Sequence, residues 1–202
     1  MTSRLVGRFN AYNLLVAFAV GKYLGQDELS LLTILSSVKA PQGRFEYFLS
    51  DHKITAVIDY AHTPDALENV LKTLLDLKKG TEKLITVFGC GGNRDKGKRP
   101  LMGEIASRLS DQVLITSDNP RNEDPDSIIN EIYHGVPSVL KEKVFTVTDR
   151  MEAIEMACNM ASAGDVILIA GKGHENYQII GNKSLHFDDM ENTIHIFKKL
   201  KK

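Results

Sequence analysis

Three loops carry most of the side chains in this sequence that could do chemistry. They are GCGGNRDKGKRP at residues 89–100, SDNPRNEDP at 117–125 and AGKGHENYQ at 170–178. Guanidinium groups and free backbone N–H groups bind carboxylates, whereas an acidic side chain such as Asp118 or Glu175 would bind an ammonium. We therefore predict a site for a zwitterionic ligand. Its charged and polar candidates are Arg94, Asp95, Lys96, Lys98, Arg99, Asp118, Asn119, Arg121, Lys172, His174 and Glu175.

The first loop also contains part of a phosphate-binding motif. Gly92–Lys98 matches GxxxxGK, but the next position, where a P-loop has Ser or Thr to hold magnesium, is Arg99. Because arginine cannot ligate a cation, we do not interpret this segment as an ATP P-loop. An anion-binding helix start fits better, since free N–H groups and the helix dipole both favour negative charge.

Alternating apolar runs and helical segments predict how these loops are positioned. Strands that are apolar on both faces and alternate with helices indicate a mostly parallel sheet that is covered on both sides. We therefore expect a Rossmann-like, doubly wound α/β domain over residues 43–202, in which ligands bind at the carboxyl ends of the strands. The expected strands are 45–49, 54–60, 83–89, 112–118, 143–148 and 165–171; the expected helices are 64–77, one starting at Pro100, 126–135, 150–161 and 190–200; a hairpin is expected to turn at Gly181–Asn182.

The first 42 residues have a different pattern. Residues 10–24 are apolar all round a helical wheel, which predicts a buried helix, and residues 27–38 predict a second helix with Asp27 as its N-cap. Pro41 to Gly43 mark a linker. Because two helices cannot make a core, we interpret residues 1–42 as the helical tail of a domain whose main body is not in this sequence.

The composition excludes several classes of protein. At 43% hydrophobic and 25% charged residues, with a formal net charge of −1, the chain is ordinary for a globular protein and gives no electrostatic reason to bind nucleic acid. It has no apolar run long enough for a transmembrane helix and no signal-peptide pattern. Cys90 and Cys158 are expected to be reduced, buried thiols of a cytoplasmic protein, and no metal site is expected.

Plainer interpretations exist for each loop. Gly-rich turns between a strand and a helix are often only connectors, and loop charges are usually solvated. Asp118 could cap a turn whose φ is fixed by Pro120. The convergence of three such loops at one sheet edge is what favours a binding site.

The order and spacing of these motifs resemble the muramyl ligases, a family that extends the bacterial cell-wall peptide. GCGGNRDKGKRPLMGEIA, SDNPRNEDP and AGKGHENYQI look like the third domain of that family. Upstream, GRFNAYNLLVAFAVG resembles the end of the central domain, and GRFE with VIDYAHTPDAL resembles the junction into the third. The resemblance runs from Gly7 onward and is nearest to members that add meso-diaminopimelate to UDP-N-acetylmuramoyl-L-alanyl-D-glutamate.

The resemblance implies two sets of binding residues. For the incoming amino acid, Arg94 and Arg121 would hold carboxylates and Glu175 the distal ammonium. For ATP, Arg44 would reach the phosphates and Asp59 the ribose. The full amino-acid set is Arg94, Asp118, Asn119, Pro120, Arg121, Gly171 and Glu175; the ATP set is Asn13, Arg44, Asp59, Tyr60 and His62. Lysine-adding relatives have a different residue in place of Arg121, which could pair bidentately with the carboxylate that lysine lacks.

The resemblance also implies what this chain lacks. In the family, ATP phosphorylates the D-glutamate carboxylate of the acceptor, and the amine of diaminopimelate attacks the acyl phosphate. The P-loop and the Mg²⁺ site belong to the central domain, and no catalytic residue of that kind lies in these 202 residues. We therefore expect a fragment that is inactive by itself, with neither nucleic acid nor membrane as a partner; the oligomeric state is left open, with a monomer expected.

Two alternatives stay open. One is a stand-alone module that binds an amino acid or a nucleotide without chemistry. The other is a related ligase that adds D-alanyl-D-alanine or glutamate, or one that polyglutamylates folate. The DNPR motif at Asp118–Arg121 argues against the second group.

Overall fold

The computed structural model describes residues 5–202, and the chain divides into two compact units. The first unit ends at Gln42 and the second is Gly43–Lys202. Residues 1–4 of the expected helical tail lie outside the described part. The origin of the first unit in a larger ATP-binding domain stays a prediction.

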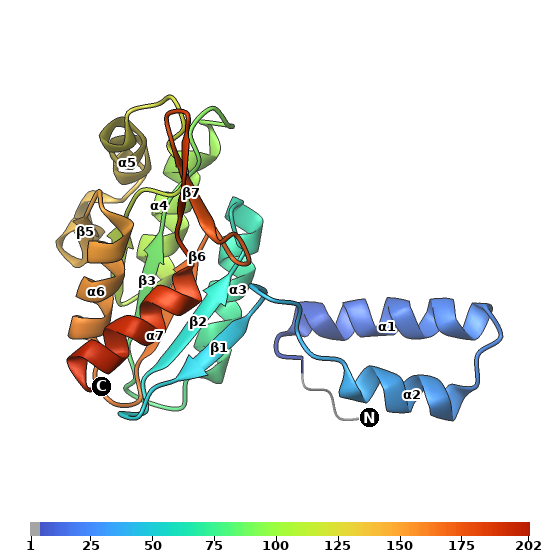
Figure 1. Ribbon diagram of the computed structural model, residues 1–202. Helices are drawn as coiled ribbons and strands as arrows, with labels where there is room; N and C mark the ends of the chain where they lie inside the picture. The colour runs from blue at the N-terminus through green and yellow to red at the C-terminus, as the bar shows by residue number, and fades with distance from the viewer. Residues whose placement is uncertain (1–4) are drawn as a thin grey trace. The chain divides into compact units, whose positions relative to one another are not determined.

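The first unit is a pair of helices, α1 (Arg8–Tyr23) and α2 (Glu28–Ser37) (Figure 1). Asp27 caps α2 as predicted, because its carboxylate accepts a hydrogen bond of 2.9 Å from the Ser30 amide. The prediction that α1 is a buried helix is wrong for this structure, in which Leu15 and Val16 are each 63% exposed. A single partner helix can cover only one side of a helix that is apolar all round.

The second unit is built on a six-stranded sheet with the order β1-β2-β6-β3-β4-β5 (Figure 1). Only the edge strand β1 is antiparallel, and the other neighbours pair in parallel, which confirms the predicted mostly parallel sheet. The strands are β1 (Glu46–Leu49), β2 (Thr55–Asp59), β3 (Leu84–Phe88), β4 (Gln112–Ile115), β5 (Val144–Thr146) and β6 (Val166–Ala170). A separate hairpin pairs β7 (Tyr177–Ile180) with β8 (Lys183–His186) across the predicted turn.

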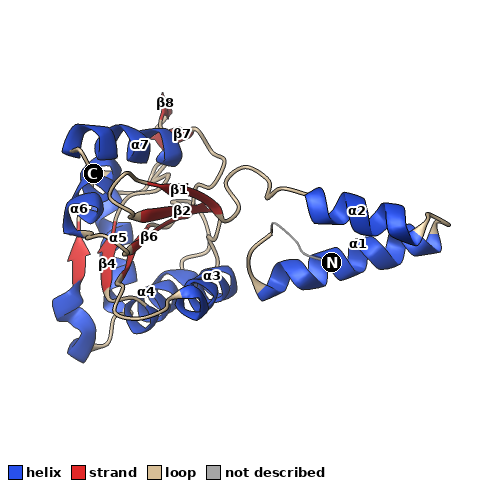
Figure 2. Ribbon diagram, turned by 90° about the horizontal axis from the view of Figure 1, so that it is seen from below, coloured by secondary structure: helices blue, strands red, loops and turns tan. Residues whose placement is uncertain are grey.

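Helices cover both faces of this sheet. On one face α4 packs against α3 and α5, and on the other α6 packs against α7; Figure 2 shows α3 and α4 on the side of the sheet opposite to α7. The chain crosses the sheet in one direction from β2 to β5 and then returns to β6. Because parallel crossovers are right-handed, this reversal places α6 on the face opposite to α3, α4 and α5. The helices are α3 (Pro64–Leu77), α4 (Lys98–Leu109), α5 (Pro125–His134), α6 (Arg150–Met160) and α7 (Asp189–Leu200), with a 3₁₀ helix η1 (Ser138–Lys143) before β5.

Local sequence explains where most of these helices begin. Thr63 caps α3 directly before Pro64, and aspartates cap α5, α6 and α7. The start expected at Pro100 is wrong by one half-turn, since α4 begins at Lys98. Its first turn closes earlier through a 3.0 Å hydrogen bond from the Arg99 amide to the Lys96 carbonyl.

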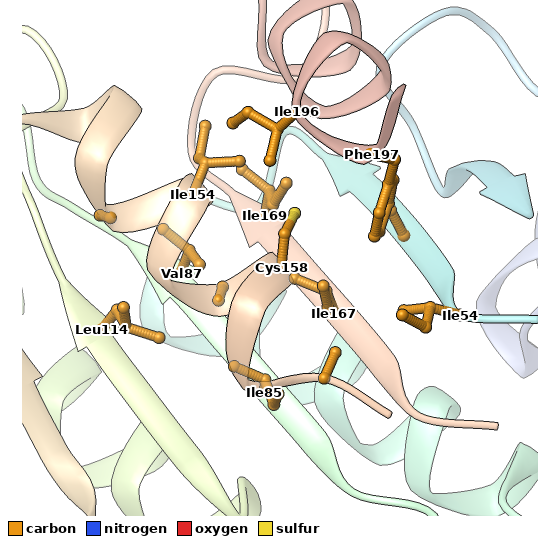
Figure 3. Packing of buried hydrophobic residues seen from close by; sticks show 14 of the residues in the cluster. Ile54, Ile85, Val87, Leu114, Ile154, Cys158, Ile167, Ile169, Ile196 and Phe197 are labelled. Carbon is orange, nitrogen blue, oxygen red and sulfur yellow. The ribbon is translucent and has the colours of Figure 1, made fainter. Parts of the chain in front are cut away.

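The core between the sheet and α6–α7 is formed by branched aliphatic side chains (Figure 3). Ile167 and Ile169 of β6 lie in this cluster with Ile154 and Cys158 of α6, and all four are fully buried. The central strands are therefore held from both faces, and they give the loops at their ends a rigid base. Cys90 and Cys158 are both unpaired and buried, as predicted.

Candidate functional site

One pocket of about 320 Å³ lies where the carboxyl ends of β2, β3, β4 and β6 lead into loops. The three loops singled out in the sequence all contribute to its wall, together with the segment after β2. The lining residues are Tyr60, His62, Thr63, Gly89, Cys90, Gly91, Arg94, Asp95, Lys98, Asp118, Asn119, Arg121, Gly171 and Glu175. The structure therefore brings together residues that are up to 115 positions apart, from Tyr60 to Glu175.

Most of the residues expected for the amino acid lie in this wall. Of that set, Pro120 is the exception: it is buried behind the loop. Of the set expected for ATP, Tyr60 and His62 line the pocket, whereas Arg44 and Asp59 lie behind or beside them. Asn13 belongs to the first unit, on α1, where its amide donates to Asn10 Oδ1 at 3.4 Å.

Two lining residues, Lys98 and Asp95, were named among the charged candidates in the sequence but without a specific role. Lys98 donates a hydrogen bond of 2.7 Å to the His62 carbonyl and so ties the start of α4 to the end of β2. Asp95 caps the next turn through the Gly97 amide at 2.8 Å. Both residues lie in the wall, as their loop position beside Arg94 predicted. Thr63 and Cys90 also line the pocket and were not among the candidates, because neither residue type carries a charge that marks a binding site.

Arg121 is held in an unusual backbone conformation. Its φ is +52°, in the left-handed region that costs a non-glycine residue roughly 1 kcal/mol. Its amide donates to the Ile179 carbonyl at 3.1 Å, and its carbonyl accepts from the Gly181 amide at 2.7 Å. The hairpin β7–β8 therefore fixes the loop that presents Arg121.

The guanidinium of Arg121 lies beside the loop that carries Arg94. Arg121 Nη1 donates to the Gly92 carbonyl at 2.9 Å and to the Asn119 carbonyl at 3.3 Å. A Cβ on Gly91 would lie 3.0 Å from Arg121 Nη1 and 3.6 Å from Arg94 Cγ. The two arginines thus flank a glycine that leaves them room, an arrangement that suits recognition of carboxylate.

An acidic side chain, Glu175, faces the same pocket from the β6 loop. Its Oε2 accepts a hydrogen bond of 2.9 Å from Asn119 Nδ2. Gly171, at the start of this loop, has φ +116°, and a Cβ there would lie 2.7 Å from Asp118 Oδ2. Glycine is therefore required at position 171 by both its backbone conformation and its close approach to Asp118.

Arg99 does not reach the pocket. Its side chain is fully buried and pairs with Glu123 at 3.0 Å and Glu131 at 2.8 Å, while Nη2 donates to the Gly91 carbonyl at 3.2 Å. The hydrogen bond from Arg99 is the largest of the effects that lower the pKa of Glu123 to about 2. The residue that breaks the P-loop pattern is therefore an internal support that joins the β3 loop to the β4 loop.

Cys90 lines the pocket but is not a reactive nucleophile. Burial raises the pKa of its thiol to about 12, and Sγ lies 3.7 Å from Met102 Sδ. A thiol with such a pKa stays protonated at neutral pH, so it acts as a small apolar side chain.

A cluster of rings and one cation forms the edge of the pocket after β2. The Tyr60 ring lies 4.7 Å from the His62 ring and 5.2 Å from the His174 ring, and Arg44 Cζ lies 5.3 Å from the Tyr60 centroid. Asp59 supports this edge from inside, because its two oxygens accept hydrogen bonds from the Phe45 and Ala61 amides at 2.7 and 2.8 Å. Burial raises the pKa of Asp59, and those two amides partly counter the effect.

Within residues 5–202, no group of three or more His, Cys, Asp or Glu side chains is placed to hold a metal ion. No helix in the same part of the chain is both long enough and apolar enough to cross a bilayer.

Residues 43–173 match a family model described as Mur ligase, glutamate ligase domain. A UDP-N-acetylmuramoyl-L-alanyl-D-glutamate–2,6-diaminopimelate ligase from Cytophaga hutchinsonii is 56% identical over 186 residues, which are 92% of this chain and 38% of the relative. The ligase of the same name from Bacteroides fragilis is 51% identical over 96% of this chain and 40% of its own length.

A solved structure of a ligase with that name superimposes with a TM-score of 0.75 and 40% identity, over all of this chain and 41% of the other. A UDP-N-acetylmuramate–alanine ligase from Thermotoga maritima, at 22% identity and a TM-score of 0.69, shares the fold. The chain therefore spans about two fifths of the length of these relatives.

Proposed function

Because the chain belongs to the Mur ligase family, we propose that its pocket binds the amino acid that such a ligase adds, and that this amino acid is 2,6-diaminopimelate. The observation that carries the proposal is Arg121, fixed by the hairpin beside Arg94 in a pocket that also contains Glu175. Diaminopimelate has two carboxylates and two ammonium groups. Lysine lacks the distal carboxylate, which is the group that a planar guanidinium recognises bidentately.

The residues around the pocket then have different roles in binding the amino acid. Arg94 and Arg121 bind carboxylate, and Glu175 binds an ammonium. Asp118, Asn119 and Gly171 shape the wall, since they hold the β4 and β6 loops against each other. Pro120 lies outside the wall, where its carbonyl approaches Gly92 of the β3 loop. These residues bind and orient the amino acid so that its amine points toward the acceptor, and none of them carries out a chemical step.

We place part of ATP at the edge formed by Tyr60, His62 and Arg44. The exposed guanidinium of Arg44 fits phosphate, and the half-buried Tyr60 ring with the exposed His62 ring fits a base or a sugar. Asp59 as a contact to the ribose, and Asn13 as a further contact, stay predictions. Bound ATP would supply the phosphoryl group that activates the acceptor.

Mg²⁺ does not fit the described residues, which offer it no acidic cluster, and we assign its site to another part of a longer protein.

The complete protein, in this proposal, is an ATP-dependent amide-bond-forming ligase of peptidoglycan synthesis in the cytoplasm. It would join 2,6-diaminopimelate to UDP-N-acetylmuramoyl-L-alanyl-D-glutamate. Support comes from the names of relatives that are 50% identical or more over most of this chain and about 2.5 times as long. This chain would be their amino-acid-binding part.

Calorimetric titration of meso-diaminopimelate and of L-lysine into this chain tests the proposal. Diaminopimelate should bind more tightly, and Arg121→Ala should weaken its binding by about 2–5 kcal/mol while lysine binding changes little. Arg121→Lys keeps the charge and loses the planar fork. Arg108→Ala is the matched control, because Arg108 is 58% exposed and pairs with Glu104 on the surface of α4. Equal affinity for the two amino acids, or an Arg121→Ala variant that binds like the wild type, would contradict the assignment.

A further inference from the structure

Lys172 is a fully buried lysine directly behind the pocket. Its Nζ donates to the Tyr177 carbonyl at 2.7 Å and to Asn119 Oδ1 at 3.2 Å, and it lies 4.0 Å from Asp118 Oδ1. Burial lowers the pKa of Lys172, and the charge of Asp118 opposes that shift. Burial of an ammonium is costly unless it is paired and hydrogen-bonded, so Lys172 and the groups around Asn119 and Asp118 depend on one another.

The contact with Asn119 settles which way the amide of that residue points. An ammonium can only donate hydrogen bonds, so the atom that faces Lys172 Nζ must be the oxygen of the amide. The Ile179 amide donates to the same oxygen at 2.9 Å. The nitrogen of the amide is therefore directed at Glu175, whose Oε2 it meets at 2.9 Å.

The contact with Asp118 changes the charge of the pocket. Asp118 lines the pocket with a side chain that is 10% exposed, and Lys172 lies behind it. Glu175 accepts a hydrogen bond from Asn119, and the charges of Lys172 and Arg150 act on it less strongly than on Asp118. A bound ammonium is thus favoured at Glu175 over Asp118, because Lys172 offsets the charge of Asp118 more strongly.

We propose that Lys172 is a positioning residue that sets the charge pattern of the amino-acid pocket, by orienting Asn119 toward Glu175 and by offsetting the charge of Asp118. The proposal rests on the function proposed above for this pocket. It assigns to Lys172 part of the selection between amino acids, although Lys172 does not itself line the pocket.

Selectivity between two amino acids separates this role from a merely structural one. At neutral pH lysine carries one more net positive charge than diaminopimelate. Lys172→Met makes the pocket region one charge more negative, so the preference for diaminopimelate over lysine should fall about tenfold in calorimetric titrations. Lys172→Arg keeps the charge and should retain the preference even where both affinities drop. A loss of affinity that is equal for both amino acids in Lys172→Met would overturn the proposal.

A second measurement needs no ligand. In ¹⁵N-resolved NMR spectra of this chain, the side-chain amide of Asn119 is identified by its response to Glu175→Gln. Its protons should exchange with solvent about tenfold faster in Lys172→Met than in the wild type. Lys143→Met is the matched control, because Lys143 is a part-buried lysine that donates to the Ser110 carbonyl at 2.6 Å, away from the pocket.

The two measurements test the function of the pocket and the role of Lys172 separately. A wild-type chain that binds neither amino acid refutes the proposed function of the pocket, and the NMR comparison still decides whether Lys172 orients Asn119. An Asn119 amide that exchanges at the same rate in Lys172→Met and in the wild type refutes the role of Lys172 whatever the chain binds.

Discussion

Replacement of Arg150 by methionine is expected to destabilise the second unit by about 3–5 kcal/mol. Arg150 Nε and Nη2 each donate to Asp189 at 2.8 Å, and both side chains are fully buried. Methionine keeps much of the side-chain volume but leaves the Asp189 carboxylate in the interior without its cation. The magnitude therefore comes from an uncompensated buried charge and not from a cavity.

A double variant tests that reason. Arg150→Met with Asp189→Leu removes both charges, and such replacements of buried pairs are commonly neutral or stabilising by about 1–4 kcal/mol. We expect it to recover most of the stability lost in Arg150→Met. The single variant should also disturb the pocket, because Arg150 Nη2 donates to the Ala170 carbonyl at 3.1 Å, one residue before Gly171.

Urea titration followed by NMR measures the change in the second unit alone, through the amides of β6. The free energy of unfolding is extrapolated linearly to water for the wild type, each single variant and the double variant. A loss below about 1 kcal/mol in Arg150→Met, or a double variant as unstable as the single one, would refute the reasoning.

Three further results are expected. Gly92→Ala would place a Cβ 1.9 Å from the Pro120 carbonyl oxygen, and we expect a loss of about 1–3 kcal/mol in the same urea titration. Gly80→Ala is the control and should change little, because a Cβ there would meet only Glu82 Oε2, at an ordinary contact distance of 3.7 Å. Since the pKa of Glu123 is lowered from 4.5 to about 2, its stabilising effect is complete above pH 4.5 and is lost as pH falls through 2. The wild type should therefore lose more stability over that range than Glu123→Gln, and parallel pH profiles would contradict the pairing with Arg99. Incubation of this chain with ATP, UDP-N-acetylmuramoyl-L-alanyl-D-glutamate and meso-diaminopimelate should release no phosphate above background, whereas turnover would show that it needs no further domain.

The strands and the hairpin could be predicted because their signals are local. Apolar runs such as 84–88 and 166–170 become strands buried on both faces, and Gly181 with Asn182 marks the turn between β7 and β8. The burial predicted for α1 depends on the surfaces that pack against it, which are not a local property of its sequence. An apolar helix becomes buried only if enough partner surface exists, and its own sequence does not specify that surface.

The site could be predicted in outline for a similar reason. Parallel strands end at the same edge, so their loops had to converge. The contacts that orient the site could not be predicted, because they join residues far apart in the chain. Lys172 contacts Asn119 across 53 positions, and the Ile179 amide contacts Asn119 Oδ1 across 60. No periodicity or motif encodes such a pair.

The distribution of charge between the interior and the pocket is the other property that the sequence does not reveal. The three loops contain six cations, of which Lys96, Arg99 and Lys172 are paired with groups of the protein itself. Those that line the pocket are Arg94, Lys98 and Arg121. Three carboxylates line it as well, Asp95, Asp118 and Glu175, and Lys172 offsets the charge of Asp118 from behind the wall. A P-loop has Ser or Thr directly after its lysine, whereas this segment has Arg99, which is buried and paired with Glu123 and Glu131. A wall that carries charges of both signs, with arginine and carboxylate at separate positions, fits an amino acid, and it supports our proposal that the GxxxxGK segment serves an amino-acid site and not a nucleotide loop.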